Sequence, residues 1–174
     1  MTNHIDLSVI ILNYNSGDYL QKCLESISQS ELGDYQIEII ITDNCSTDQS
    51  INLAREINCP NTKFLILNDN RGFAAGNNQG LKISDPKSKY VLFLNPDTLV
   101  EKNTFKTMID FFETNSSADA ATCYIKLVKT GQMQPECHRG FPTPWRSFSY
   151  FTGLYKLAPK SNFLNGYFLG HLDL

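Results

Sequence analysis

The chain has 174 residues, of which 41% are hydrophobic and 19% charged, and its net charge is −3. This length suits one domain with a substantial core, and the composition is ordinary for a folded protein. The mildly acidic balance argues against a nucleic-acid-binding surface, which needs a basic face. It does not exclude a nucleotide ligand, because one local cation and a metal ion are enough to bind a diphosphate.

The five cysteines form neither a C-x-x-C pair nor a spacing typical of a zinc site. Their odd number, with no secretory signal at the N-terminus, indicates reduced thiols in a cytoplasmic compartment. The longest apolar runs are too short to span a bilayer. We therefore expect a cytoplasmic protein.

Four short apolar runs in the first half of the chain predict β-strands, at residues 7–12, 37–41, 63–67 and 90–94. Apolar residues recur at helical spacing between and after these runs, and Ser16 is the expected N-cap of the first helix. Strands that alternate with helices through short connections indicate βαβ units. The sequence thus predicts an α/β fold with a mostly parallel sheet flanked by helices, Rossmann-like in its N-terminal half.

The fourth run, Tyr90 to Leu94, is uninterruptedly apolar, which predicts a central strand buried on both faces. Pro96 ends this strand, because proline cannot donate to a sheet ladder. Asp97 therefore follows the carboxyl end of a strand, where open α/β sheets bind their ligands. Taken alone, an aspartate at this place is equally well explained as a turn residue or a helix N-cap.

Beyond residue 119 the pattern changes. Residues 120–128 predict a further strand, and 129–132 a hairpin turn. Residues 135–174 are rich in proline and aromatic side chains without clear periodicity, which predicts a long loop that is functional or belongs to a larger structure. We place a domain boundary after residue 125, with residues 126–174 as the start of a second region, and we expect the chain to be truncated.

Polar clusters follow all four predicted strands: Asn13-Tyr14-Asn15, Asp43-Asn44, Asn70-Arg71-Gly72 and Asn95-Pro96-Asp97. Parallel strands place these clusters at one edge of the sheet. Together they supply an aromatic face, two carboxylates, a guanidinium group and several amides. This combination suits a nucleoside diphosphate with a metal ion, although each cluster alone could be simple turn chemistry.

The sequence lacks the motifs of two common classes of nucleotide-binding protein. No G-x-G-x-x-G follows the first strand and no G-x-x-x-x-G-K-[ST] is present, which argues against a dinucleotide-binding oxidoreductase and a P-loop protein. The glycine-rich segment 72–80 fits neither motif. Its glycines would let backbone approach a bound phosphate or sugar, or Ala74, Ala75 and Gly76 would simply allow a helix to pack closely on the sheet.

Four segments resemble, in order and spacing, family 2 glycosyltransferases of the GT-A fold: residues 9–15, 43–48, 70–78 and 94–98. The resemblance is strong from residue 7 to about 112 and looser beyond. Leu94-Asn95-Pro96-Asp97 is most similar to the rhamnosyltransferase-like branch, which implies dTDP-rhamnose as the donor.

The resemblance also implies roles for individual residues. Tyr14 would line the base pocket, Asp43 would bind the base, and Arg71 would lie beside the donor. Asp97 would bind Mg²⁺ or Mn²⁺, while Asn95 stands where the D-x-D motif has its first aspartate. An amide adds no charge, so metal affinity would depend on the donor diphosphate. The expected nucleotide-sugar ligands are Asn13, Tyr14, Asn15, Asp43, Asn44, Arg71, Gly72, Gly76, Asn77 and Asn95.

The reaction that the resemblance implies is an inverting sugar transfer to a glycan or lipid-linked acceptor in cell-surface polysaccharide synthesis. A carboxylate base deprotonates the acceptor hydroxyl, which attacks the anomeric carbon as the nucleoside diphosphate leaves. No residue here matches that base. We expect it beyond Leu174, and we interpret Asp173 as an ordinary loop carboxylate.

Two other functions remain open at this point. One is a catalytically silent nucleotide-sugar-binding or assembly module, which would share the site but lack the base. The other is a sugar-phosphate nucleotidyltransferase, which would need a glycine-rich loop where Asn13-Tyr14-Asn15 stands.

Arg139 and Arg146 flank aromatic residues, and two interpretations are open for them. They contact the phosphate or lipid of an acceptor, which would fit peripheral association with the inner face of a membrane, or they belong to a packed aromatic loop. An unpaired sheet edge would also allow the domain to form an oligomer.

Overall fold

A computed structural model describes residues 4–134, 137 and 139–170. The chain divides into two compact units, Met1–Asp119 and Ala120–Leu174. This division falls after Asp119, whereas the boundary proposed from the sequence follows residue 125.

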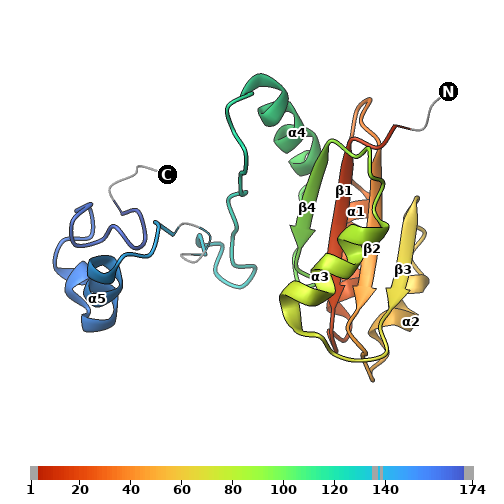
Figure 1. Cartoon of the computed structure of the whole chain (residues 1–174), viewed down its shortest axis with the longest axis horizontal. Helices are drawn as coiled ribbons and strands as arrows, with labels where there is room; N and C mark the ends of the chain where they lie inside the picture. The colour runs from red at the N-terminus through yellow and green to blue at the C-terminus, as the bar shows by residue number, and fades with distance from the viewer. Residues whose placement is uncertain (1–3, 135–136, 138, 171–174) are drawn as a thin grey trace. The chain divides into compact units, whose positions relative to one another are not determined.

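The first unit is built on a parallel sheet of four strands in the order β3-β2-β1-β4. The strands are β1 (Leu7–Asn13), β2 (Ile37–Asp43), β3 (Thr62–Ile66) and β4 (Tyr90–Leu94). All four point the same way, so their carboxyl ends lie at one edge of the sheet (Figure 1). The predicted α/β fold with a parallel sheet is confirmed.

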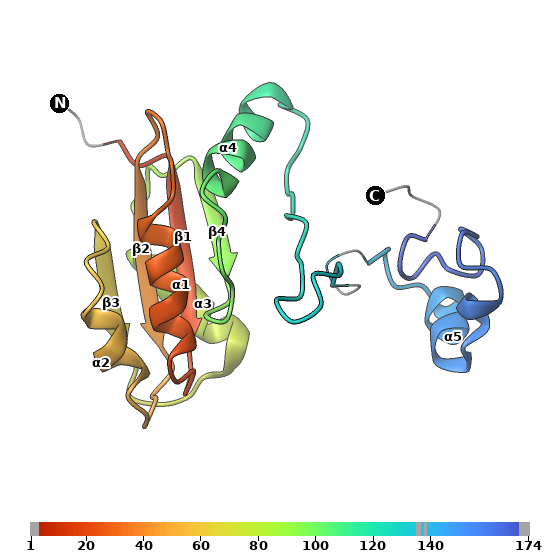
Figure 2. The same cartoon turned by 180° about the vertical axis from the view of Figure 1, so that it is seen from behind.

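Helices cover both faces of this sheet. Helix α3 (Gly72–Ile83) lies on the face seen in Figure 1, and α1 (Tyr19–Ser28) and α2 (Ser50–Arg55) lie on the opposite face, seen in Figure 2. Helix α4 (Thr104–Thr114) adds buried side chains to the core on the α1 face. Because both faces are covered, β1 is buried along its whole length and its sequence is almost entirely apolar.

Close packing of α3 on the sheet explains two of its glycines. A β-carbon added to Gly76 would lie 2.4 Å from Leu12 Cδ1, and one added to Gly80 would lie 2.7 Å from Ile10 Cγ2. A larger residue at either position would force the facing side chains of the sheet or the helix itself to shift. The packing interpretation of the glycine-rich segment therefore accounts for both positions.

The prediction that residues 90–94 form a central strand buried on both faces is wrong. Strand β4 lies at the edge of the four-stranded sheet, and Val91 and Phe93 are 41% and 50% exposed. The physical reason is the position of α3, which packs on β1 and β2. The apolar run in the sequence could not show which strands that helix covers.

The expected N-cap of the first helix is also corrected. Helix α1 begins at Tyr19 with Asp18 as N-cap residue, two positions later than predicted. The Ser16 hydroxyl instead donates to Asn13 Oδ1, while the Ser16 carbonyl accepts from the Tyr19 N–H at 3.1 Å. Ser16 thus belongs to the loop that follows β1.

The second unit contains helix α5 (Pro144–Thr152) and a 3-10 helix, η2 (Leu154–Leu157). The strand predicted at 120–128 is wrong, since only one isolated bridge forms there, between Lys126 and Met133. The predicted turn at 129–132 is confirmed by the Leu127 N–H, which donates to the Gln132 carbonyl at 2.8 Å. Helix α5 forms where no periodicity was recognised. None of the helices built from the described residues has the length and apolar character needed to cross a bilayer.

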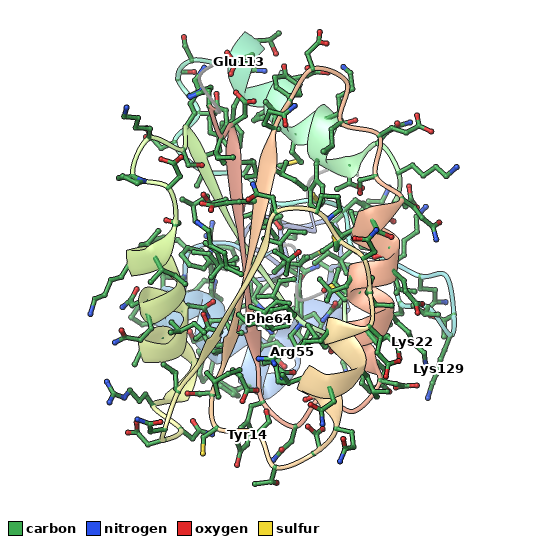
Figure 3. The ribbon with its side chains drawn as sticks, turned by 90° about the vertical axis from the view of Figure 1, so that its right-hand side faces the viewer. Tyr14, Lys22, Arg55, Phe64, Glu113 and Lys129 are labelled. Carbon is green, nitrogen blue, oxygen red and sulfur yellow. The ribbon has the colours of Figure 1, made fainter. Side chains whose placement is uncertain are left out.

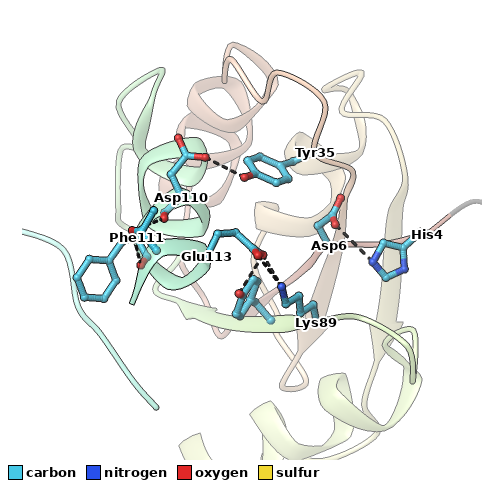
Figure 4. A network of polar contacts seen from close by, with 9 residues as sticks. His4, Asp6, Tyr35, Lys89, Asp110, Phe111 and Glu113 are labelled. Carbon is cyan, nitrogen blue, oxygen red and sulfur yellow. Dashed lines mark hydrogen bonds and ion pairs between the residues drawn. The ribbon is translucent and has the colours of Figure 1, made fainter. Parts of the chain in front are cut away.

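Polar contacts anchor α4 near the amino-terminal end of the sheet (Figure 4). Tyr35 Oη donates to Asp110 Oδ1 at 2.8 Å, and Lys89 Nζ contacts Glu113 Oε1 at 2.6 Å. His4 and Asp6 approach to 3.4 Å close by. Ion pairs at this level of exposure contribute little stability individually, so the packing of Phe105 and Ile109 is the main attachment of α4.

A buried carboxylate lies at the same, amino-terminal end of the sheet. Glu38 on β2 accepts hydrogen bonds from Ser8 Oγ at 2.6 Å, the Asp85 N–H at 2.6 Å and Lys63 Nζ at 2.7 Å. Burial alone would raise the pKa of Glu38. The Asp85 N–H, Lys63 and Ser8 together outweigh this effect, so its pKa lies below the usual value.

We predict that Glu38→Gln lowers the free energy of unfolding by about 1–3 kcal/mol at neutral pH, because a buried charge-assisted network loses its charge. The carboxyl pKa is lower in the folded than in the unfolded chain. Its contribution is therefore present above the unfolded pKa and is lost as the pH falls through the folded value. Urea denaturation should show the gap between wild type and variant narrowing in acid. Glu113→Gln, at an exposed ion pair, is the control and should change stability little. A difference in the free energy of unfolding between wild type and Glu38→Gln that is equal at neutral and at acidic pH would contradict the account.

Candidate functional site

The loops that follow the four strands meet at the carboxyl edge of the sheet. Tyr14, in the loop after β1, lies beyond the ends of the strands at the bottom of Figure 3, while Glu113 marks the opposite end. The side chains predicted to act here fall into two groups. Some are buried and hydrogen-bonded to one another, and others are exposed.

Asn13 and Asp43 join the ends of β1 and β2. They are partners in the parallel register, and both are buried. Asn13 Nδ2 donates to Asp43 Oδ1 at 2.7 Å and to Ser50 Oγ at 2.8 Å. Asp43 also accepts from Ser46, through the hydroxyl at 2.6 Å and the N–H at 3.0 Å. Both carboxylate oxygens of Asp43 are therefore engaged within the protein.

Further contacts fasten the loop after β1 to the loop after β2. The Asn15 N–H donates to Ser46 Oγ at 2.9 Å, and Asn15 Oδ1 accepts from the Thr47 N–H at 2.8 Å. Asn15 has a φ of 48°, in the left-handed region that asparagine tolerates better than most residues. The two loops thus form one hydrogen-bonded body.

Asp48 adds a further hydrogen bond between the loops after β1 and β2. Its Oδ2 accepts from the Gly17 N–H at 2.8 Å, and its Oδ1 accepts from the Ser50 N–H at 3.1 Å. Burial alone would raise the pKa of Asp48, but the hydrogen bonds from Ser50 and Gly17 outweigh it and hold the pKa below the usual value. Asp48 therefore links the start of α2 to the turn before α1.

Asn44 extends the network to the loop after β3. Its Oδ1 accepts from the Arg71 N–H at 3.0 Å, and its Nδ2 donates to Asn70 Oδ1 at 2.7 Å. Asn70 Oδ1 also accepts from the Gly72 N–H at 2.9 Å, where the backbone φ of 77° requires glycine or strain. The buried Asn44 side chain thus fixes the backbone at Arg71 and, with it, the start of α3.

Five predicted side chains are exposed at this edge: Tyr14, Asn15, Arg71, Asn95 and Asp97, of which Asn15 is held by the contacts described above. Tyr14 is 52% exposed, so its ring is free to stack on a ligand. Arg71 Nε donates to Asp69 Oδ1 at 2.9 Å, which engages one of the five N–H donors of the guanidinium group. Within residues 4–134, 137 and 139–170, no hydrogen bond or ion pair engages the Asp97 carboxylate.

Cys23 on α1 lies beneath the loop that carries Asp97. Its thiol Sγ is 4.0 Å from the Asn95 carbonyl oxygen. Burial raises the pKa of Cys23 to about 12, with a smaller contribution from the negative charge of Asp97. The thiol is therefore a neutral packing group, and it gives the loop after β4 an apolar support.

The predicted residues are thus only partly brought together as exposed groups. Asn13, Asp43, Asn44 and Asn77 are buried, and Gly76 packs against Leu12. Direct contacts of these five with a ligand remain predictions. Sequence reasoning missed the structural roles of Ser46, Asp48 and Ser50, although their spacing after Asp43 is typical of side chains that cap turns and helix starts.

The donor groups at this edge fit a hard cation only in part. Among the described residues no three His, Cys, Asp or Glu side chains gather closely enough to hold a metal ion. Asp97 and Asn95 offer oxygen ligands of the kind that Mg²⁺ and Mn²⁺ prefer. A metal ion held here would take its remaining ligands from water and from a bound diphosphate.

Comparison with known proteins identifies the fold and the family. The profile of "Glycosyl transferase family 2" matches residues 8–170. The minor teichoic acid biosynthesis protein GgaB of Bacillus subtilis is 34% identical over 110 residues, which are 62% of this chain and 12% of GgaB. The poly(ribitol-phosphate) β-N-acetylglucosaminyltransferase TarS of Staphylococcus aureus is 29% identical over 111 residues, 63% of this chain and 19% of TarS.

Solved structures agree with these relatives. Residues 1–349 of S. aureus TarS in complex with UDP-GlcNAc superpose with a TM-score of 0.65 at 27% identity, covering 82% of this chain and 38% of that one. A mannosyltransferase from Pyrobaculum calidifontis, solved with GDP-Man and Mn²⁺, has a TM-score of 0.55 over 78% of this chain and 37% of its own. At 20% identity the latter likeness concerns the fold alone. The chain spans less than two fifths of each of these proteins.

The division into buried and exposed residues gives a direct prediction. Asp43→Ala should lower the free energy of unfolding by about 2–3 kcal/mol, because it removes the acceptor of one hydrogen bond from the buried Asn13 amide and of two from Ser46, through its hydroxyl and its N–H. Asp97→Ala should change stability by less than about 0.5 kcal/mol, because an exposed unpaired carboxylate is removed. Chemical denaturation measures both values. Equal losses for the two variants would contradict the assignment of Asp43 to the buried, hydrogen-bonded group.

Proposed function

The chain belongs to glycosyl transferase family 2, and on that premise we propose that it binds a nucleoside-diphosphate sugar at the carboxyl edge of the sheet. The sugar is then transferred, with inversion, to a glycan or lipid-linked acceptor in cell-surface polysaccharide synthesis. One observation carries the proposal. Tyr14, Arg71 and Asp97 are exposed on the loops after β1, β3 and β4, and hydrogen bonds join the first two of these loops through the loop after β2.

Each exposed group has a distinct task in this proposal. The nucleoside base stacks on the Tyr14 ring, and the free N–H groups of Arg71 donate to the diphosphate. Asn95 accepts a hydrogen bond from the ribose or from a metal-bound water. A divalent cation shared by Asp97 and the diphosphate would stabilise the negative charge of the leaving group.

Asp43 is the proposed determinant of the base. Its Oδ2 accepts one hydrogen bond, from the Ser46 N–H, and a carboxylate oxygen can accept a second. Uracil and thymine carry a ring N–H that can donate to it. The Leu94-Asn95-Pro96-Asp97 motif supports dTDP-rhamnose as donor, and TarS was solved with UDP-GlcNAc. We therefore propose a pyrimidine nucleoside-diphosphate sugar.

The alternative of a catalytically silent binding module shares this site and differs only in turnover. Release of UDP or dTDP from the corresponding nucleotide sugar in the presence of acceptor separates the two hypotheses. We further propose that the protein acts in the cytoplasm, which agrees with five free cysteines.

Replacement of the proposed metal ligand should uncouple nucleotide binding from metal. In calorimetric titrations with UDP, dTDP and GDP, the wild type should bind one pyrimidine nucleotide more tightly with Mn²⁺ than with EDTA. Asp97→Ala should remove this difference, because it takes away the charged protein ligand of the cation and leaves the uncharged Asn95, water and the diphosphate. Asp69→Ala, at the neighbouring exposed carboxylate, should retain it. A metal effect that survives in Asp97→Ala would take Asp97 out of the site.

Removal of the aromatic ring should weaken nucleotide binding without affecting the fold. Tyr14→Ala should reduce affinity for the preferred nucleoside diphosphate by about 1–3 kcal/mol, the scale of base stacking on aromatic side chains. Tyr14→Phe should bind like the wild type, since it keeps the ring. The same titration measures both, and an unchanged affinity in Tyr14→Ala would mean that the base lies elsewhere.

A further inference from the structure

The second unit distributes its aromatic residues in an unusual way. Tyr150 stacks on Tyr167 with ring centroids 4.6 Å apart, Phe168 packs edge-on against Tyr150 at 5.3 Å, and all three side chains are half-buried. Phe141 and Phe151, in contrast, are 83% and 82% exposed. Phe141 and Phe151 are therefore left in contact with solvent, while two tyrosines, Tyr150 and Tyr167, are partly packed.

Helix α5 shows a similar distribution within nine residues. Ser149 is completely buried and donates through its hydroxyl to the Leu164 carbonyl at 2.6 Å. Trp145, Phe148 and Phe151 follow one another at intervals of three residues and are all exposed. Residues at this spacing are neighbours on a helix surface. The helix therefore presents a stripe of aromatic rings to solvent.

Phe163 widens this stripe into a surface. Its ring lies 4.9 Å from that of Trp145, which in turn lies 5.8 Å from Phe148. Trp145 Nε1 donates to the Phe163 carbonyl at 2.8 Å, so the polar group of the indole is already satisfied. Trp145, Phe148, Phe151 and Phe163 are called the aromatic surface below. Exposed apolar patches of this kind mark interaction sites.

Charge identifies the partner of this surface. Residues 120–174 include six lysines and arginines but two acidic residues, Glu136 and Asp173. Residues 1–119, by comparison, carry nine basic and sixteen acidic side chains. The basic residues of the second unit are Lys126, Lys129, Arg139, Arg146, Lys156 and Lys160. A partner that complements this unit would be both apolar and negatively charged.

We propose that the aromatic surface and the lysines and arginines of the second unit bind an anionic lipid bilayer. Phenylalanine and tryptophan rings enter the boundary between headgroups and acyl chains, and basic side chains attract the anionic headgroups. Their long stems allow the charges to stay in the headgroup layer while the rings are buried. A phosphate-rich soluble glycan would satisfy the charges but not the phenylalanine rings, so the bilayer is the better match. This inference is independent of the donor site.

Vesicle co-sedimentation of the whole chain tests the proposal. Vesicles of equal parts phosphatidylcholine and phosphatidylglycerol should bind the protein, and pure phosphatidylcholine vesicles should bind it at least tenfold more weakly. Phe151→Ser should lower the partition coefficient about tenfold, the scale of one exposed ring entering an apolar phase. Lys156→Gln combined with Lys160→Gln should lower it by a similar factor and should reduce its salt dependence.

Matched variants in the first unit provide the control. Phe73→Ser removes a phenylalanine that is 66% exposed on α3 and should leave vesicle binding unchanged. Circular dichroism should confirm that all variants keep the fold. Binding to soluble polyphosphate that is as tight as binding to anionic vesicles, and insensitive to Phe151→Ser, would overturn the proposal in favour of an anionic glycan. Equal binding to both kinds of vesicle, or to neither, would overturn it as well.

Discussion

The hydrogen bonds between Asn13 and the loop after β2 are the interactions on which the proposed site depends. Asn13 Nδ2 donates to Asp43 and to Ser50, and it does so at the point where β1 and β2 end side by side. Because all these groups are buried, each one left without a partner would cost free energy. Every one of these groups has a hydrogen-bond partner, and the bonds fix the relative positions of the loops after β1 and β2. These loops are distant in the sequence and are neighbours because β1 and β2 pair.

This arrangement distinguishes residues that are buried and held by contacts within the protein from residues that are exposed to solvent at the edge. Asp43 and Asn44 are held by contacts within the protein, while Tyr14 and Arg71 extend from backbone that those contacts position. A stacking ring or a guanidinium group on a loose loop would lose conformational entropy when a ligand binds. Where the loops are already fixed by hydrogen bonds, much of this conformational entropy has been lost during folding. This suits a site that must hold a flexible diphosphate. Asp97 has a different support, since its loop rests on the buried Cys23 thiol.

The sequence predicted the parts of this structure that follow from local patterns. The apolar runs and the turn clusters located all four strands, and their alternation with helices was enough to place the polar clusters at one edge. It could not predict which strand lies at the edge of the sheet, because Val91 and Phe93 are as apolar as residues of a covered strand. The partners of Asp43 were equally out of reach, since the contacts with Asn13 join residues thirty positions apart.

Helix α5 is a different case, because a signal for it was present. The Thr143 hydroxyl accepts from the Arg146 N–H, Pro144 stands at the first turn, and Gly153 ends the helix with a φ of 77°. Threonine before proline and a later glycine are ordinary helix boundaries. Trp145, Phe148 and Phe151 also recur at the three-residue spacing of one helix face. The helix is nine residues long, so this periodic signal is short and was not recognised among the surrounding prolines and aromatic residues.

The central claim is that the four loops at the carboxyl edge form one nucleotide and metal site. Paramagnetic broadening in nuclear magnetic resonance spectra of the isotope-labelled chain tests it most directly. With UDP or dTDP present, substoichiometric Mn²⁺ should broaden amide signals around Asp97 first and then those of the loops after β1, β2 and β3. Signals near Glu38, at the other end of the sheet, should stay sharp. Broadening that centres on any other part of the chain, or that is the same without nucleotide, would contradict the account.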